Sequence, residues 1–173
     1  MAAVTLDIDE DEAICGPKRT DTAAMQQKCV LVIEDSEEAM LLVRFALEEY
    51  GQGAYRLEWA SNLGDGLDFL AAGQIDVVLL DLGLPDSSGP ESFAWVREIA
   101  PQVPVVVLTG DAKAETERAI TAGGVEGYLV KDLVSAADVV DTLRDALLVG
   151  KRKREQREKE GRSVSPSPFR IRS

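Results

Sequence analysis

Five short apolar segments alternate with five longer segments of helical periodicity between Lys28 and Gly150, and this alternation constrains the fold more than any other feature. The third apolar segment, residues 75–80, is apolar at nearly every position, which is typical of a strand buried on both faces. Buried strands that alternate with helices predict a parallel sheet with helices on both faces. Right-handed crossovers and an early reversal of winding predict a doubly wound α/β fold with strand order 2-1-3-4-5.

Turn and capping residues divide the alternation into elements. The expected strands cover about residues 29–33, 55–59, 75–80, 103–108 and 128–130. Ser36, Asn62 and Ser135 can cap the first, second and last helices. Ser88 and Glu91 have the spacing of a capping box before the third helix. The segment near residues 113–122 has only a weak apolar face and is expected to form the fourth helix.

Charge divides the chain into three parts. Residues 1–27 carry six acidic and two basic residues and are expected to form a disordered arm. Residues 28–150 form the expected domain, and residues 151–173 carry three acidic and nine basic residues. Glu155 and Lys159 favour a helical extension, followed by a disordered Ser/Pro segment. Two interpretations of this basic tail are open. It could bind a protein, a membrane or a nucleic acid, or it could be a solvated end or the stub of a truncated multidomain protein. We favour the second interpretation.

The composition excludes several classes of function. The chain has no histidine, which excludes a Ser/His/Asp triad, a histidine-bearing zinc site and an internal phosphohistidine. The acidic domain would not attract nucleic acid through its own field. No apolar run is long enough to span a membrane, and because the chain opens with acids and not with a basic and then an apolar region, we expect no secretory signal. Cys15 and Cys29 lie in unlike contexts, so no disulfide is expected, and a cytoplasmic location fits.

Polar residues stand at the carboxyl end of four expected strands. They are Glu34 and Asp35 after the first, Asp81 after the third, Thr109 at the end of the fourth and Lys131 after the fifth. Parallel strands place these ends at one edge of the sheet, where ligands bind in open α/β folds. Clustered carboxylates repel one another unless a cation compensates them, and oxygen ligands suit Mg²⁺. Lys131 and Thr109 can hold phosphoryl oxygens, which leaves Asp81 as a nucleophile that forms an aspartyl phosphate.

Each residue alone has an ordinary structural explanation. Glu34 and Asp35 could be acids at a helix entry, Thr109 a strand-ending hydroxyl and Lys131 a surface lysine. Tyr128, next to that lysine, could be core or edge packing. Their joint occurrence at four strand ends favours the phosphoryl-transfer site.

Four segments of the chain resemble the motifs of a known protein family. They are Val-Leu-Val-Ile-Glu-Asp at 30–35, Val-Val-Leu-Leu-Asp at 77–81 with Pro85 and Gly89 beyond it, Val-Val-Val-Leu-Thr-Gly at 105–110, and Gly-Tyr-Leu-Val-Lys at 127–131. In this order they resemble the receiver domain of two-component response regulators, over about residues 28–150. The resemblance is to the single-domain type, such as the chemotaxis response regulator. The resemblance implies the flavodoxin-like form of the doubly wound fold.

The resemblance implies a role for each site residue. Asp81 would be the phosphoacceptor, and Thr109 and Lys131 would hold the phosphoryl group. Tyr128 would be the aromatic residue that turns inward when Thr109 moves.

The resemblance also implies a magnesium site. The side chains of Asp35 and Asp81 and the main-chain carbonyl of Gly83 would bind Mg²⁺, with Glu34 acting through water. The family often has proline after the lysine, joined by a cis bond. Here Asp132 follows Lys131, so the geometry of that peptide bond is left open.

The implied partners are proteins. The resemblance implies a phosphohistidine donor on a sensor histidine kinase or a histidine phosphotransfer protein. Because this chain has no histidine, that donor must be another molecule. The tail is too short for an output domain, so we expect signalling through protein contacts, with a possible homodimer through the fourth helix, fifth strand and last helix. Neither direct DNA binding nor enzymatic activity beyond self-phosphotransfer and slow autodephosphorylation is expected.

Two rival functions were weighed. The first is a receiver-like interaction module that works without phosphorylation. The second is an aspartyl-phosphate hydrolase of the dehalogenase type, which needs an acid two residues after the nucleophile. Gly83 occupies that position, and no lid domain is apparent, so the sequence disfavours this hydrolase.

Overall fold

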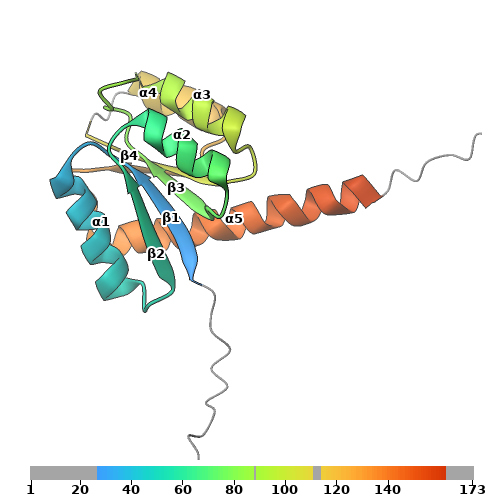
Figure 1. The fold of residues 1–173 in the computed structure, drawn as a ribbon, viewed down its shortest axis with the longest axis horizontal. Coiled ribbons are helices and arrows are strands. Elements are labelled where there is room, and N and C mark those ends of the chain that lie inside the picture. The colour runs from blue at the N-terminus through green and yellow to red at the C-terminus, as the bar shows by residue number, and fades with distance from the viewer. Residues whose placement is uncertain (1–26, 88, 111–113, 163–173) are drawn as a thin grey trace, which may run out of the picture.

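The computed structural model describes residues 27–87, 89–110 and 114–162, which form alternating strands and helices (Figure 1). The strands are β1 (Lys28–Ile33), β2 (Tyr55–Ala60), β3 (Val77–Leu80), β4 (Val105–Thr109) and β5 (Gly127–Val130). The helices are α1 (Glu37–Tyr50), α2 (Leu63–Ala72), α3 (Pro90–Ile99), α4 (Ala114–Ala122) and α5 (Ala136–Arg162). No helix in the described part of the chain is both long and apolar enough to cross a bilayer.

All strand pairs are parallel, and the sheet order is β2-β1-β3-β4-β5. The predicted doubly wound, flavodoxin-like fold is therefore confirmed. Helices α1 and α5 cover one face of the sheet, and α2, α3 and α4 cover the other (Figure 1). The order reverses between β1 and β3, which opens a ligand position at the carboxyl ends of these two strands.

Each face of the sheet has its own hydrophobic core. Alternate residues of the central strands, such as Leu31 and Val78, pack toward α2, α3 and α4. Their neighbours, such as Val32 and Leu79, pack toward α1 and α5. Residues of both sets are buried, which explains why the central strands read as unbroken apolar runs.

Three of the predicted helix caps are confirmed. The side chains of Ser36, Asn62 and Ser135 accept main-chain N–H bonds at the starts of α1, α2 and α5. The predicted capping box before α3 depends on Ser88, which lies outside the described residues. Helix α3 begins at Pro90 after Gly89, whose φ of 41° lies in the left-handed region that favours glycine.

Helix α2 packs closely on β1 at Gly66. A Cβ atom added there would lie 2.5 Å from Cδ1 of Ile33, a buried residue with little room to move. We expect Gly66→Ala to lower the free energy of unfolding by about 1–2 kcal/mol, because crowding of the core outweighs the better helix propensity of alanine. Chemical denaturation measures this change.

Gly64 provides the matched control in the same helix, because its added Cβ would approach no atom closer than 3.4 Å. Gly64→Ala should leave stability unchanged or slightly higher. Equal effects of the two substitutions would contradict the close packing of α2 on β1.

Candidate phosphoryl-transfer site

The sheet itself fixes the backbone of the site residues, because its hydrogen-bond ladder continues past the strand ends. The N–H of Glu34 donates to the carbonyl of Ala60, and the N–H of Asp81 donates to that of Ile33, both at 2.9 Å. The N–H of Lys131 donates to the carbonyl of Thr109, also at 2.9 Å. The side chains therefore leave β1, β3 and β5 at one edge of the sheet with little freedom of the main chain.

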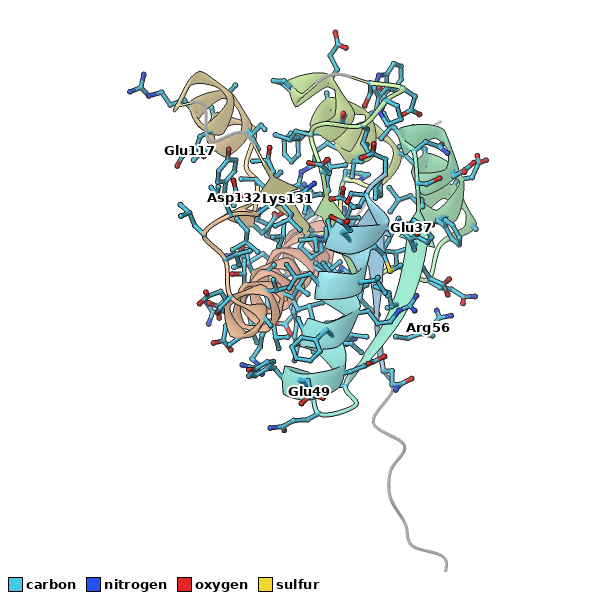
Figure 2. All side chains as sticks on the ribbon, turned by 90° about the vertical axis from the view of Figure 1, so that its left-hand side faces the viewer. Glu37, Glu49, Arg56, Glu117, Lys131 and Asp132 are labelled. Atoms are coloured by element: carbon cyan, nitrogen blue, oxygen red, sulfur yellow. The ribbon has the colours of Figure 1, made fainter. Side chains whose placement is uncertain are left out.

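This edge brings together residues from both ends of the domain. The Lys131 ammonium lies 2.7 Å from Oε2 of Glu34, which is 97 positions away, and 3.2 Å from Oδ2 of Asp81. Figure 2 shows Lys131 at the same end of the molecule as Glu37, the first residue of α1, and far from Glu49 near the end of that helix.

Three carboxylates face one another at this edge. Glu34, Asp35 and Asp81 each offer an oxygen within 4.8 Å of the others. Glu34 and Asp81 are buried, whereas Asp35 is exposed. One lysine does not neutralise three acids, so the cluster retains negative charge that a cation can compensate.

Burial and pairing shift the pKa values of Glu34 and Lys131. Burial raises the pKa of Glu34, against the opposing hydrogen bond from Lys131, and the charge of Asp81 raises it further. Burial alone would lower the pKa of Lys131, but the hydrogen bond to Glu34 and the charge of Asp81 outweigh it and raise that pKa. The ammonium is therefore kept in its charged form, which is the form that can hold a phosphoryl oxygen.

Asp81 has one buried oxygen that no described residue satisfies. Its Oδ1 lies out of solvent with no hydrogen-bond partner, while Oδ2 faces Lys131. Buried carboxylate oxygens without partners are costly, so this oxygen is suited to a ligand or a metal ion. The all-oxygen set of Glu34, Asp35 and Asp81 fits a hard cation such as Mg²⁺.

The other predicted site residues surround this cluster. Thr109 is buried at the end of β4, and Gly83 is exposed two residues beyond Asp81. A Cβ at Gly83 would lie 3.2 Å from Oδ2 of Asp81, so glycine leaves the carboxylate accessible. Tyr128 is half-buried against the core on the α4 side of the sheet. The Lys131–Asp132 peptide bond, left open by the sequence, is trans.

Two features of the surroundings were not predicted. Asp86 accepts hydrogen bonds from the N–H groups of Leu63 and Gly64, which ties the loop after β3 to the start of α2. These bonds lower the pKa of Asp86. The indole of Trp59 donates to the carbonyl of Glu34 at 2.7 Å and holds the segment between β1 and α1. Both contacts join residues more than twenty positions apart, and neither leaves a local pattern in the sequence.

The family model of the response regulator receiver domain matches residues 30–144, which include every strand of the sheet except the first two residues of β1. The chain belongs to this receiver-domain family. It is 32% identical over 122 residues to the polar-differentiation response regulator DivK of Brucella ovis, a match that covers 69% of this chain and 96% of the relative.

Solved structures agree with the receiver fold. A response regulator receiver domain from Clostridium thermocellum aligns with a TM-score of 0.63 at 27% identity and covers 75% of this chain and 98% of that one. A CheY-like receiver domain from Methanospirillum hungatei JF-1 aligns with a TM-score of 0.66 at 23% identity, covering 74% and 99%. The predicted receiver domain is thus confirmed, and the roles given to individual site residues stay predictions.

Proposed function

We propose that this receiver domain accepts a phosphoryl group onto Asp81 from a phosphohistidine of a sensor kinase or phosphotransfer protein in the cytoplasm. The observation that carries the proposal is the Asp81 carboxylate itself, which is buried, has one oxygen without a hydrogen-bond partner among the described residues and has the other oxygen facing Lys131. A structural aspartate would have both oxygens satisfied. A nucleophilic aspartate instead needs a carboxylate oxygen that is open to the reacting group.

The transfer balances with groups that the two proteins supply. An oxygen of Asp81 attacks phosphorus while the phosphorus–nitrogen bond of the donor breaks. The bonding electrons go to the departing imidazole, and a proton already on the other ring nitrogen of the phosphohistidine lets it leave as a neutral histidine. Lys131 pairs with a phosphoryl oxygen, and the Thr109 hydroxyl donates to another, so both stabilise the charge that develops in the transition state.

The side chains of Asp35 and Asp81 and the carbonyl of Gly83 would hold Mg²⁺, with Glu34 acting through water. The bound ion supplies charge neutralisation between the attacking carboxylate and the incoming phosphoryl group. Asp35 is exposed, so it can exchange ligands, whereas Glu34 is buried and already paired with Lys131. A bound cation would compensate the repulsion among Glu34, Asp35 and Asp81, which would explain why the three acids lie together.

The output would be a change in protein contacts. Phosphorylation would draw Thr109 toward the phosphoryl group and let Tyr128 turn inward, which alters the face formed by α4, β5 and α5. This face would bind a downstream protein or a second copy of the chain. The domain would act as a regulatory phosphoacceptor whose only chemistry is self-phosphotransfer and slow dephosphorylation.

Magnesium should stabilise the fold through the acidic cluster. At a concentration one hundred times its dissociation constant, Mg²⁺ should add about 2.7 kcal/mol to the free energy of unfolding. Asp35→Asn should abolish most of this gain and also slow phosphate incorporation from a small donor such as phosphoramidate. Thermal unfolding with and without Mg²⁺ measures the first effect, and intact mass measures the second.

Asp65→Asn is the matched control, because Asp65 is an exposed acid at a helix start outside the cluster. It should retain the full response to Mg²⁺. An Asp35→Asn protein that responds to Mg²⁺ like the wild type would contradict the proposed metal site.

A further inference from the structure

The last part of α5 forms a basic helical arm, residues 151–162, that continues past the sheet (Figure 1). It carries seven basic and three acidic residues. Every side chain described in it, from residue 151 to 159, is exposed, and none of these side chains is apolar. A helix of this composition has no hydrophobic face to insert into a bilayer or to pair with another apolar helix.

The base of the basic arm is fixed to the domain. Lys153 pairs at 2.6 Å with Oε1 of Glu126, whose side chain is buried at the start of β5. Gly150 packs on Pro104 so closely that an added Cβ would lie 3.0 Å from that ring. The direction of the arm relative to the sheet is therefore set by contacts and not left to the helix alone.

Much of the positive charge on the basic arm is not neutralised within the described residues. Lys151 reaches Glu155 only at 3.9 Å. Arg152, Arg154, Arg157 and Lys159 form no ion pair with any residue that the structure describes. Arg154 and Arg157 lie three positions apart in the helix and therefore on the same face. In a chain with a net charge of −12 this is a concentrated site for an anionic partner.

The N-terminal part of the chain enters the domain beside the basic arm. Gln27 and Arg154 line the same cleft of about 560 Å³, and Lys28, Lys151 and Arg154 line an adjoining cleft of about 350 Å³. The segment upstream of Gln27 contains the acidic run Asp7–Glu12, which has five acids in six positions.

The linker between the acidic run and the domain has a suitable length. Residues 13–26 are fourteen residues, which can reach at most about 50 Å when fully extended. The twelve residues of the basic arm extend about 18 Å as a helix. Tethering over this distance gives an effective concentration in the millimolar range, which favours the chain's own acidic run over a dilute external anion.

We propose that the acidic segment Asp7–Glu12 binds the basic arm of the same chain and masks it. The contact is an ionic clasp around Arg154 and Arg157, next to the point where the N-terminal segment enters the domain. Any anionic partner of the arm must displace this segment, so access to the arm is regulated by the chain itself. The clasp weakens with added salt because its charges are exposed.

The test uses the full-length protein with a nitroxide on Cys15, three residues after the acidic run, and with the buried Cys29 replaced by alanine. We expect NMR relaxation enhancement of the amide signals of residues 151–159 at low salt. Arg154→Glu together with Arg157→Glu should at least halve it, and 0.5 M salt should do the same. Neutralising Asp9, Glu10, Asp11 and Glu12 to their amides should reproduce the loss without touching the helix.

The matched control reverses two exposed basic residues elsewhere, Arg44→Glu with Arg118→Glu, which changes the net charge equally. It should leave the enhancement intact. The clasp is overturned if the relaxation enhancement persists both in the Arg154→Glu, Arg157→Glu variant and in the variant with the neutralised acidic run. It is also overturned if the wild type shows no relaxation enhancement. Enhancement seen only between separate nitroxide-labelled and isotope-labelled molecules overturns it in favour of a second copy. Tight binding of duplex DNA that is unchanged by amidation of the acidic run overturns it in favour of a nucleic acid.

Discussion

Lys131→Met should slow phosphoryl transfer to Asp81 by about a hundredfold or more, because it removes a charged donor aimed at the phosphoryl oxygens. The Lys131 ammonium lies 3.2 Å from Oδ2 of Asp81 and 2.7 Å from Oε2 of Glu34. No other basic residue in the described part of the chain is within ion-pair distance of either carboxylate. The rate of phosphate incorporation from phosphoramidate, followed by intact mass, measures this effect.

The same substitution tests the ionisation of Glu34. Without the lysine, the buried Glu34 carboxylate loses the interaction that lowers its pKa, while burial and Asp81 still raise it. We expect the pKa of Glu34 to rise further, so that the carboxylate takes up a proton more readily and the loss of stability stays below that of a stranded buried charge. Lys151→Met, at an exposed lysine, is the control and should leave the transfer rate unchanged. A Lys131→Met protein that is phosphorylated at the wild-type rate would contradict the role given to this residue.

Glu126→Ala should lower the free energy of unfolding by about 3 kcal/mol, the largest stability effect that we expect from a single side chain. The buried Glu126 carboxylate accepts from the Val105 N–H at 2.7 Å and pairs with Arg97 and Lys153, each at 2.6 Å. Its loss leaves the Val105 N–H without this partner and the Arg97 charge less compensated. Arg97 keeps bonds to two carbonyl groups, which limits the cost.

Chemical denaturation of Glu126→Ala and of an exposed control, Asp141→Ala, measures this difference. Asp141 pairs with Arg144 on the surface, so its loss should cost no more than about 0.5 kcal/mol. Similar effects of the two substitutions would show that the Glu126 network does not hold the sheet, α3 and the basic arm together.

The parallel sheet was predictable because its central strands are buried on both faces. Residues such as Val78 and Leu79 point to opposite cores, and both must be apolar, so the run is visible in the sequence alone. The backbone geometry before α3 was not predictable in the same way. Gly89 has a left-handed φ directly before the helix begins, and no apolar pattern in the sequence indicates it.

The site was predictable where strand order determines position. The rule that parallel strands end at one edge places Asp81 and Lys131 together although fifty positions separate them. The pairing of Lys131 with Glu34 was not predicted, because a lysine side chain can reach several acids at such an edge. The Glu126 network was missed for a related reason: its members come from α3, β4, the start of β5 and α5, and nothing local in the sequence connects them.

The central claim is that Asp81 accepts a phosphoryl group at a magnesium-dependent site. The most direct measurement is the intact mass of the wild type and of Asp81→Asn after incubation with phosphoramidate, with and without Mg²⁺. We expect the wild type to gain one phosphate only when Mg²⁺ is present, and Asp81→Asn to gain none. No gain by the folded wild type, or an equal gain by the variant, would contradict the phosphorylation mechanism and favour an interaction module that works without phosphate.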